Sequence, residues 1–209
     1  MENDFCLNVI EEKNALRKKN RLALKNLFSF GAPTENSLAA NERIINLKSF
    51  SESHIVLAFL QAGNEISCSK IIEEARKQNK ILAVPRIRPG TSLMDFFVLK
   101  NDVPLHAQTE IGSYNILEPL TTLKKIEPEN LSEKNVFAVI PGLGFTKNGE
   151  RLGKGKGFYD RYIPTIIAKK LTLCGLCFDC QIVQSIPTDS HDIKVDFVAT
   201  ESALLRTSI

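Results

Sequence analysis

Apolar and polar positions along the chain follow two different periods, which predict helices and short buried strands. The segment from Glu11 to Leu27 places four leucines among charged residues over a length typical of a helix. A second helix is predicted from Glu35 to Leu47, entered after Pro33-Thr34. The apolar run from His54 to Leu60 is short for a helix and predicts a buried strand.

The next part of the chain is predicted to form a helix and a second strand. Gly63 interrupts the apolar run, and Ser67 is placed to cap a helix through about Gln78. Ile81 to Val84 predict a strand that is closed by Pro85. The two strands are joined by a connection of about twenty residues, which is typical of a parallel crossover unit.

The rest of the chain adds further strands and one helix. Strands are predicted at 93–99, where an edge strand is expected, and at 136–140, 171–178 and 197–200, and a helix is predicted to begin near Phe158. Residues 100–135 contain three prolines and little periodicity, so most of them are interpreted as loops. The sequence therefore predicts a single α/β domain with a mostly parallel sheet flanked by helices on both faces.

Composition argues against several classes of protein. Of the 209 residues, 43% are hydrophobic and 24% are charged, which is enough apolar surface to form a core rather than a disordered chain. No apolar run reaches the roughly 18 residues that span a bilayer. Residues 1–7 lack the basic start and apolar stretch of a signal peptide. A net charge of +3 is too small to indicate nucleic-acid binding. We expect a cytoplasmic protein with no nucleic acid and no membrane as partner.

Three of the five cysteines have a spacing that resembles part of an iron–sulfur motif, namely Cys174, Cys177 and Cys180. Their segment is predicted to be a strand, and side chains three positions apart on a strand point to opposite faces. A fourth ligand is also missing nearby in the sequence. We interpret these residues as small buried apolar side chains, kept as thiols in a reducing compartment.

Candidate chemistry lies in the segment Pro141–Asp160, which holds six of the 11 glycines and follows the clearest strand. Open α/β sheets bind ligands at the carboxyl ends of their strands, where this segment begins. The stretch Gly153–Gly157 alternates glycine with lysine, so that backbone N–H groups and ammonium groups can approach phosphate oxygens together. Arg151 adds positive charge, and Asp160 in the following helix suggests a divalent cation between carboxylate and phosphate.

This loop matches neither common phosphate-binding motif. A P-loop needs Lys-Ser/Thr directly after its last glycine, whereas Phe158 follows Gly157 here. A dinucleotide fingerprint has its third glycine one position later than Gly157 stands in this loop. A flexible basic surface loop is the alternative interpretation.

The segment Pro141–Asp160 resembles the signature of the 5-formyltetrahydrofolate cyclo-ligases, also called 5,10-methenyltetrahydrofolate synthetases. Shorter stretches resemble other landmarks of this family in the same order: Lys13-Asn-Ala-Leu-Arg17, Phe59-Leu60, Asn64-Glu65-Ile66, Val84-Pro85, Met94-Asp-Phe96, Ile116-Leu-Glu-Pro119 and His191-Asp-Ile-Lys-Val-Asp196. Together they imply one cyclo-ligase domain over residues 1–209. The sequence departs from the family's pattern at Thr146, where Asp is usual, and at Phe158, where Tyr is usual.

The resemblance implies an ATP- and magnesium-dependent ring closure. In this family ATP phosphorylates the formyl oxygen of 5-formyltetrahydrofolate, N10 attacks the activated carbon, and phosphate leaves as the methenyl bridge forms. The implied partners are ATP and 5-formyltetrahydrofolate, with or without a polyglutamate tail, and the implied cofactor is Mg²⁺. A monomer is expected. The sequence shows no nucleophile–base pattern, and phosphoryl transfer needs mainly positioning and charge neutralisation.

The family's site residues carry over to matching positions of this sequence. ATP would be held by Lys13, Arg17, Arg151, Leu152, Gly153, Lys154, Gly155, Lys156, Gly157, Phe158 and Tyr159. The folate would contact Leu60, Glu65, Lys154, Gly155, Lys156, Gly157 and Phe158, with Glu65 hydrogen-bonded to the pterin. Magnesium would be held by Asp160 and Asp192, and the catalytic groups would be Lys156 and Arg151.

Each of these assignments has a structural alternative. Lys13 and Arg17 lie one turn apart on a helix rich in cations and could form a solvated face. Glu65 could belong to an acidic turn that caps a helix. Asp160 could stabilise a first helical turn, and Asp192 could lie in a turn before the last strand.

Two other functions are compatible with the loop. A non-catalytic relative could bind nucleotide or RNA, although Asp160 and Asp192 argue against it because carboxylates repel phosphates in the absence of a metal. An unrelated ATP-dependent small-molecule kinase is the second alternative. A phosphate-release assay with 5-formyltetrahydrofolate, together with absorbance of the methenyl product, separates the three.

Overall fold

The central sheet of the computed structural model has seven strands in the order β11-β10-β9-β6-β1-β2-β3. The structure describes the backbone of residues 2–31 and 33–207, and side chains from residue 9 onward within these ranges. The inner strands pair in parallel and are β1 (Ile55–Leu57), β2 (Ile81–Ile87), β6 (Leu131–Ile140), β9 (Ala168–Leu176) and β10 (Phe197–Ala199). The edge strands β3 (Met94–Val98) and β11 (Leu204–Arg206) are antiparallel to their neighbours. The predicted mostly parallel α/β sheet is therefore confirmed.

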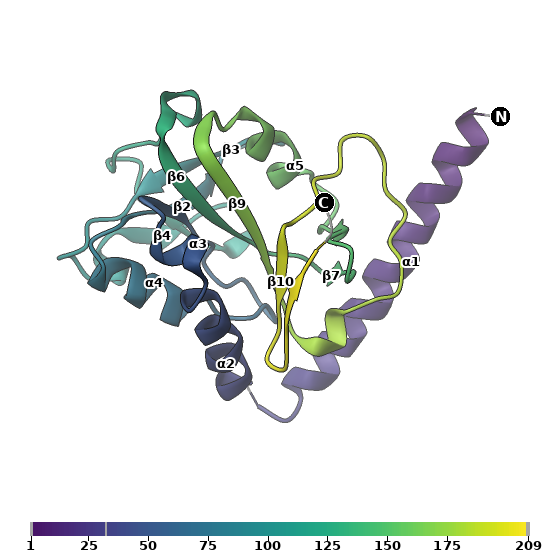
Figure 1. The fold of residues 1–209 in the computed structure, drawn as a ribbon. Coiled ribbons are helices and arrows are strands. Elements are labelled where there is room, and N and C mark those ends of the chain that lie inside the picture. The colour runs from purple at the N-terminus through teal and green to yellow at the C-terminus, as the bar shows by residue number, and fades with distance from the viewer. Residues whose placement is uncertain (1, 32, 208–209) are drawn as a thin grey trace.

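Apolar runs in the sequence became the central strands because the sheet is covered on both faces. The two longest strands, β6 and β9, lie side by side through the middle of the molecule (Figure 1). Residues 136–140 of β6 and residues 55–57 of β1 are buried without interruption. Strands that are buried on both faces need no alternation of polar and apolar residues.

One face of the sheet is covered by α2 (Thr34–Ile45), α3 (Lys48–Ser51) and α4 (Ser69–Lys77). Their fully buried side chains Ile44, Phe50 and Ile71 join Phe137 of β6 in one core cluster: the helices contribute their apolar stripes and the sheet its inner face.

The other face is covered by a shorter element. α5 (Phe158–Tyr162) begins where the sequence predicted a helix, and Pro164 lies in the turn η4 (Ile163–Thr165) that follows it. Tyr162 and Ile163 pack into a second core cluster with Phe96 of β3. Helices on both faces agree with the prediction.

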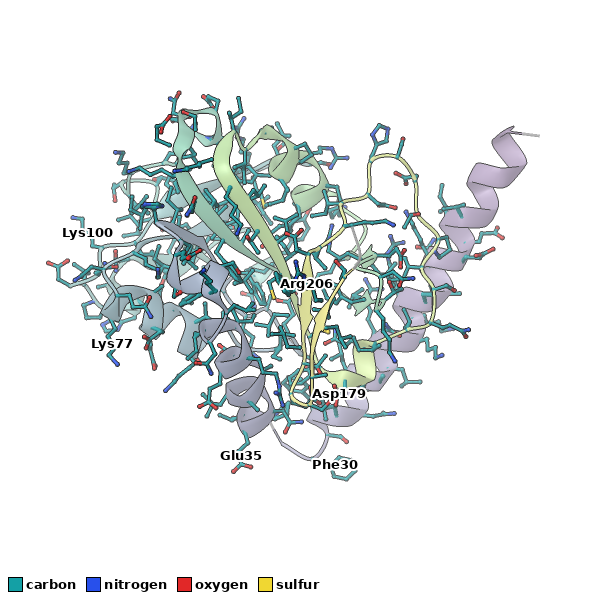
Figure 2. The ribbon with its side chains drawn as sticks, in the orientation of Figure 1. Phe30, Glu35, Lys77, Lys100, Asp179 and Arg206 are labelled. Carbon is teal, nitrogen blue, oxygen red and sulfur yellow. The ribbon has the colours of Figure 1, made fainter. Side chains whose placement is uncertain are left out.

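The N-terminal helix α1 (Glu2–Phe28) lies along one side of the molecule, and its first turns extend past the other elements (Figure 1). Leu24 anchors it in the first core cluster. The turn after it presents Phe30 outward to solvent (Figure 2). Within the described residues, no helix is long and apolar enough to cross a membrane.

Several predicted boundaries differ from the structure. α1 begins well before Glu11, because no glycine or proline precedes that residue to stop the helix. Ser67 does not cap α4. Its hydroxyl accepts a hydrogen bond from the Ser69 N–H, while Cys68 at the N-cap offers no side-chain bond. β2 does not end at Pro85 as predicted but continues through it. Only residues 81–83 of β2 pair with β1, so the missing N–H of a proline farther along removes no hydrogen bond between these two strands.

The segment interpreted as loops contains a hairpin. β4 (Thr109–Ile111) and β5 (Leu117–Pro119) pair antiparallel around η2 (Ser113–Asn115). Tyr114 and Asn115 both have φ of 56°, the left-handed conformation of a tight hairpin turn. Tyrosine is uncommon in that conformation, so its residue type did not indicate a turn at this position.

The three cysteines with iron–sulfur spacing do not come together. Cys174 belongs to one core cluster, Cys177 belongs to the cluster on the opposite face, and Cys180 is exposed. Within the described part of the chain, no three His, Cys, Asp or Glu side chains are grouped to hold a metal ion. The prediction that Cys174 and Cys177 point to different faces is confirmed, but the prediction that all three are buried is wrong for Cys180, which lies beyond the strand in the turn η5 (Asp179–Gln181).

Candidate active site

A cavity of about 1160 Å³ opens at the carboxyl ends of the parallel strands. Phe59 and Leu60 after β1, Pro141 after β6 and Pro85 late in β2 line its inner part. Every site residue predicted from the sequence lines this same cavity: Lys13, Arg17, Leu60, Glu65, Arg151, Leu152, Gly153, Lys154, Gly155, Lys156, Gly157, Phe158, Tyr159, Asp160 and Asp192. The fold thus gathers residues from four distant parts of the chain.

The glycine-rich segment enters the cavity through a small hairpin and leaves it into α5. β7 (Gly144–Phe145) and β8 (Arg151–Leu152) pair antiparallel, and the loop follows β8 directly. Gly155 and Gly157 have φ angles of 102° and 66°, which residues with a Cβ rarely adopt. The glycines therefore permit the loop's path, and the neighbouring Lys154 and Lys156 are exposed at the cavity.

Arg151 and Asp160 form a close ion pair at the base of this loop, in which one guanidinium nitrogen contacts both carboxylate oxygens. Arg151 Nη2 lies 2.7 and 2.8 Å from the two carboxylate oxygens of Asp160, and Nη1 donates to the Pro141 carbonyl at 3.2 Å. The Arg151 side chain is only 5% exposed, and its guanidinium carbon lies 5.7 Å from the centre of the Tyr159 ring. Its Nε is buried without a hydrogen-bond partner among the described residues. Arg151 thus already has an anionic partner before any phosphate arrives.

α1 brings Lys13 and Arg17 to the opposite wall of the cavity. Lys13 Nζ lies 2.6 Å from Asp192 Oδ2 and 3.2 Å from Asp189 Oδ2. Burial lowers the pKa of the Lys13 ammonium, but hydrogen bonds to the two carboxylates outweigh it and the pKa is raised. Arg17 Nε donates to the Gly153 carbonyl at 3.0 Å, which ties α1 to the glycine loop. These two cations line a cavity and do not form a solvated helix face.

The two residues predicted to hold magnesium both line the cavity, and Asp160 contacts the backbone beside Asp192. Asp160 Oδ1 accepts a hydrogen bond of 3.3 Å from the N–H of Ile193, the residue after Asp192. Both carboxylates are paired with cations, Arg151 and Lys13, so they do not require a metal for charge balance in this state. Mg²⁺ on a phosphate chain needs only one or two carboxylates, so the two residues fit an ion that arrives with phosphates.

Glu65, predicted to bind the pterin, is also paired in the structure. Its Oε1 lies 2.6 Å from Lys154 Nζ, and its Oε2 accepts a hydrogen bond of 2.9 Å from the Ala62 N–H. The Glu65 side chain is only 12% exposed. The acidic turn proposed as its alternative role is thus partly present, since Glu65 closes the turn after Leu60, yet its carboxylate also lines the cavity.

One wall of the cavity was not identified from the sequence. The β4–β5 hairpin contributes Tyr114, Asn115 and residues 116–118, and Tyr114 is an exposed ring 6.0 Å from Lys156 Nζ. Asp189, which pairs with Lys13, was also missed. The quoted landmark Ile116–Pro119 was a signal for this wall, but the sequence alone did not indicate that it faces the glycine loop.

The two departures from the family's pattern are accommodated locally. Thr146 is buried, and its hydroxyl oxygen accepts hydrogen bonds from the N–H groups of Asn148 and Glu150, each at 3.2 Å. An aspartate can make the same bonds in such a turn, so threonine preserves the hairpin. The Thr146 hydroxyl donates to the Glu150 carboxylate and holds its pKa below the usual range. Phe158 keeps an aromatic ring at the cavity and packs on the second core cluster.

A basic glycine loop at the carboxyl edge of an open parallel sheet is typical of α/β enzymes that bind phosphate-containing ligands there. Comparison with known proteins narrows this class. Residues 9–201 match the sequence profile of the 5-formyltetrahydrofolate cyclo-ligase family. The chain belongs to this family and is accordingly an enzyme.

Individual relatives agree with this assignment. The chain is 32% identical to 5-formyltetrahydrofolate cyclo-ligase from Mus musculus, covering 95% of this chain and 98% of the relative. It is 30% identical to the enzyme of the same name from Escherichia coli (strain K12), over 72% of this chain and 79% of the relative. The NMR structure of 5,10-methenyltetrahydrofolate synthetase from Aquifex aeolicus superposes with a TM-score of 0.76 at 26% identity, covering 94% of this chain and 93% of that one.

Proposed function

We propose that this enzyme converts 5-formyltetrahydrofolate to 5,10-methenyltetrahydrofolate, with ATP as co-substrate and release of ADP and phosphate. The observation that carries the proposal is the convergence of all predicted nucleotide, folate and metal residues on one cavity. Its volume of about 1160 Å³ exceeds the roughly 300–1,000 Å³ of common single-ligand pockets, as expected for two substrates held side by side.

The reaction proceeds in two chemical steps. The formyl oxygen attacks the γ-phosphorus of ATP, the bond to the β-phosphate oxygen breaks, and ADP leaves. The N10 lone pair then attacks the activated formyl carbon, and the tetrahedral adduct expels phosphate with its electron pair while N10 loses its proton. The product carries the amidinium bridge between N5 and N10.

The chain's own residues position the substrates and neutralise charge. Lys156, exposed between two glycines at the cavity, balances the negative charge of the transferring phosphoryl group. Lys13 and Arg17 receive the remaining phosphates from the α1 side. Arg151 adds positive charge for the nucleotide's phosphates while its Nη2 holds the Asp160 carboxylate at the base of the loop.

The folate occupies the half of the cavity between β1 and the hairpin. Glu65 accepts hydrogen bonds from the pterin ring, and Leu60 packs against it. Tyr114 offers an aromatic face beside Lys156, where the formyl group must meet the phosphoryl donor.

Magnesium would be held by Asp160 and Asp192 together with the phosphate oxygens. When bound, it neutralises phosphate charge and orients the nucleotide. We further propose that residues 1–209 form one cyclo-ligase domain that acts as a cytoplasmic monomer. These features stay predictions.

The proposal is tested by supplying the purified protein with ATP, Mg²⁺ and 5-formyltetrahydrofolate and recording both phosphate release and methenyl absorbance. We expect equal amounts of the two products. ADP formation without the methenyl product would indicate a kinase, and ligand binding without either product would indicate a non-catalytic relative.

The Glu65→Gln variant tests the folate half of the site. An amide cannot accept two pterin hydrogen bonds, so we expect the KM for folate to rise by at least tenfold while nucleotide binding is retained, the loss corresponding to about 1.4 kcal/mol or more. Glu73→Gln, an exposed carboxylate of α4, is the matched control and should leave both unchanged. An equal loss for folate and nucleotide would contradict the assignment.

A further inference from the structure

One ion pair joins the two halves of the cavity. Lys154 belongs to the glycine loop, on the proposed nucleotide side, and Glu65 follows β1 on the proposed folate side. Their charged atoms lie 2.6 Å apart, which is a short charge-assisted hydrogen bond. The ion pair therefore connects Glu65, which is assigned to the folate, with a loop lysine that is assigned to both substrates.

The two partners differ in how freely they can move. The Lys154 side chain is 46% exposed and lies in a loop whose glycine neighbours permit several conformations, whereas the Glu65 carboxylate is 12% exposed. Glu65 is also held by the Ala62 N–H. When the pair opens, Lys154 is the partner that leaves, and Glu65 stays in place with one oxygen released.

We propose that Lys154 exchanges partners during substrate binding, leaving Glu65 for the nucleotide's phosphates and thereby freeing the carboxylate for the pterin. This inference rests on the proposed function and adds a coupling between its two substrates. Either ligand alone must break the ion pair, because the phosphates need the ammonium and the pterin needs the carboxylate. When both bind, the pair is broken only once.

Positive coupling follows from this shared cost. Each substrate binds more tightly when the other is present, and the factor is the same in both directions by thermodynamic linkage. Because Lys154 is half exposed and its charge is screened by water, we expect a factor of roughly tenfold, near the lower end of the range for coupled sites.

The test is a set of calorimetric titrations on the full chain. 5-Formyltetrahydrofolate is titrated with and without a saturating, non-hydrolysable ATP analogue and Mg²⁺, and the analogue is titrated with and without the folate. In the wild type, the Kd for folate should fall about tenfold when the analogue is present.

Lys154→Met removes the ion pair and keeps most of the side chain's volume. In this variant folate alone should bind about as tightly as it binds to the nucleotide-loaded wild type, and the coupling factor should approach one. Lys154→Arg keeps the charge and should retain coupling. Lys147→Met, an exposed lysine of the same segment, is the matched control and should behave as wild type. Circular dichroism confirms that each variant is folded.

The outcomes separate this inference from the proposed function. A wild type that binds both ligands with a coupling factor of one, or a Lys154→Met variant with undiminished coupling, would overturn the partner exchange and leave the function intact. A wild type that fails to bind folate would refute the function itself and this inference with it. Loss of folate affinity in Lys154→Met would also refute the exchange, since it would make Lys154 a direct folate contact.

Discussion

The ion pair between Arg151 and Asp160 should be a main support of the glycine loop, and removing one partner should expose that role. The Arg151→Met variant loses two hydrogen bonds, of 2.7 and 2.8 Å, and leaves the Asp160 carboxylate without its cation. Breaking a buried pair costs about 3–5 kcal/mol. In this variant the Asp160 carboxylate still accepts the hydrogen bond from the Ile193 N–H and keeps some contact with solvent. We therefore expect the free energy of unfolding to fall by about 3 kcal/mol.

Arg151→Lys should recover part of this loss. Lysine keeps the charge but lacks the planar guanidinium that reaches both the Asp160 carboxylate and the Pro141 carbonyl, so we expect a loss of about 1–2 kcal/mol. For a chain of this size, about 3 kcal/mol lowers the melting temperature by roughly 6–12 °C.

A double-mutant cycle with Asp160→Asn measures the interaction itself. Unfolding in urea should be followed by far-ultraviolet circular dichroism, because the chain has no tryptophan. We expect a coupling energy of about 2 kcal/mol between the two positions. If the loss of stability in the double variant equals the sum of the two single losses to within about 0.5 kcal/mol, the pair does not support the fold and our reasoning is wrong.

Arg88 and Asp95 provide a matched control for the effect of burial. In this pair Arg88 Nε and Nη2 each donate to one carboxylate oxygen, at 2.6 and 2.7 Å, but the Arg88 side chain is 49% exposed. Water screens such a pair, so its cycle should give less than about 1 kcal/mol. Equal coupling in both cycles would show that burial does not determine the energy of these pairs.

Three further predictions concern the site and the pH dependence of stability. Lys156→Ala should lower turnover by at least a hundredfold, or about 2.7 kcal/mol, with little change in melting temperature, and near-normal turnover would remove it from the proposed role. Asp192→Ala should raise the Mg²⁺ concentration needed for activity, whereas His191→Ala should not. Magnesium titrations of the two variants, with melting curves alongside, measure this difference. If both variants are destabilised to a similar extent and neither changes the magnesium dependence, Asp192 has a purely structural role. The Arg88 guanidinium holds the pKa of Asp95 below its usual range. This pair therefore stabilises the fold at pH values above the ordinary carboxyl pKa, and the stabilisation is lost as the pH falls through the lowered pKa of Asp95. Between about pH 5 and 2, the Asp95→Asn variant should therefore lose less stability in acid unfolding than the wild type does.

Local sequence patterns determined the elements that carry the site. The apolar run ending at Leu60 and the run ending at Ile140 could only be buried strands, and their carboxyl ends lie at one edge because the sheet is parallel. The glycines between 142 and 157 identified the loop that follows, because its backbone needs conformations that other residues avoid. The candidate residues were therefore within reach of sequence reasoning.

Only the tertiary structure determined how those residues are paired. Lys13 and Asp192 are 179 positions apart, and nothing local predicts that the ammonium of one meets the carboxylate of the other. The same holds for Glu65 and Lys154, which come from separate elements and meet because β1 and β6 are neighbours. Tyr114 entered the cavity through a left-handed turn that its residue type disfavours. Such contacts depend on strand order and on the path of loops, which are set by the packing of the whole chain and not by any short segment of it.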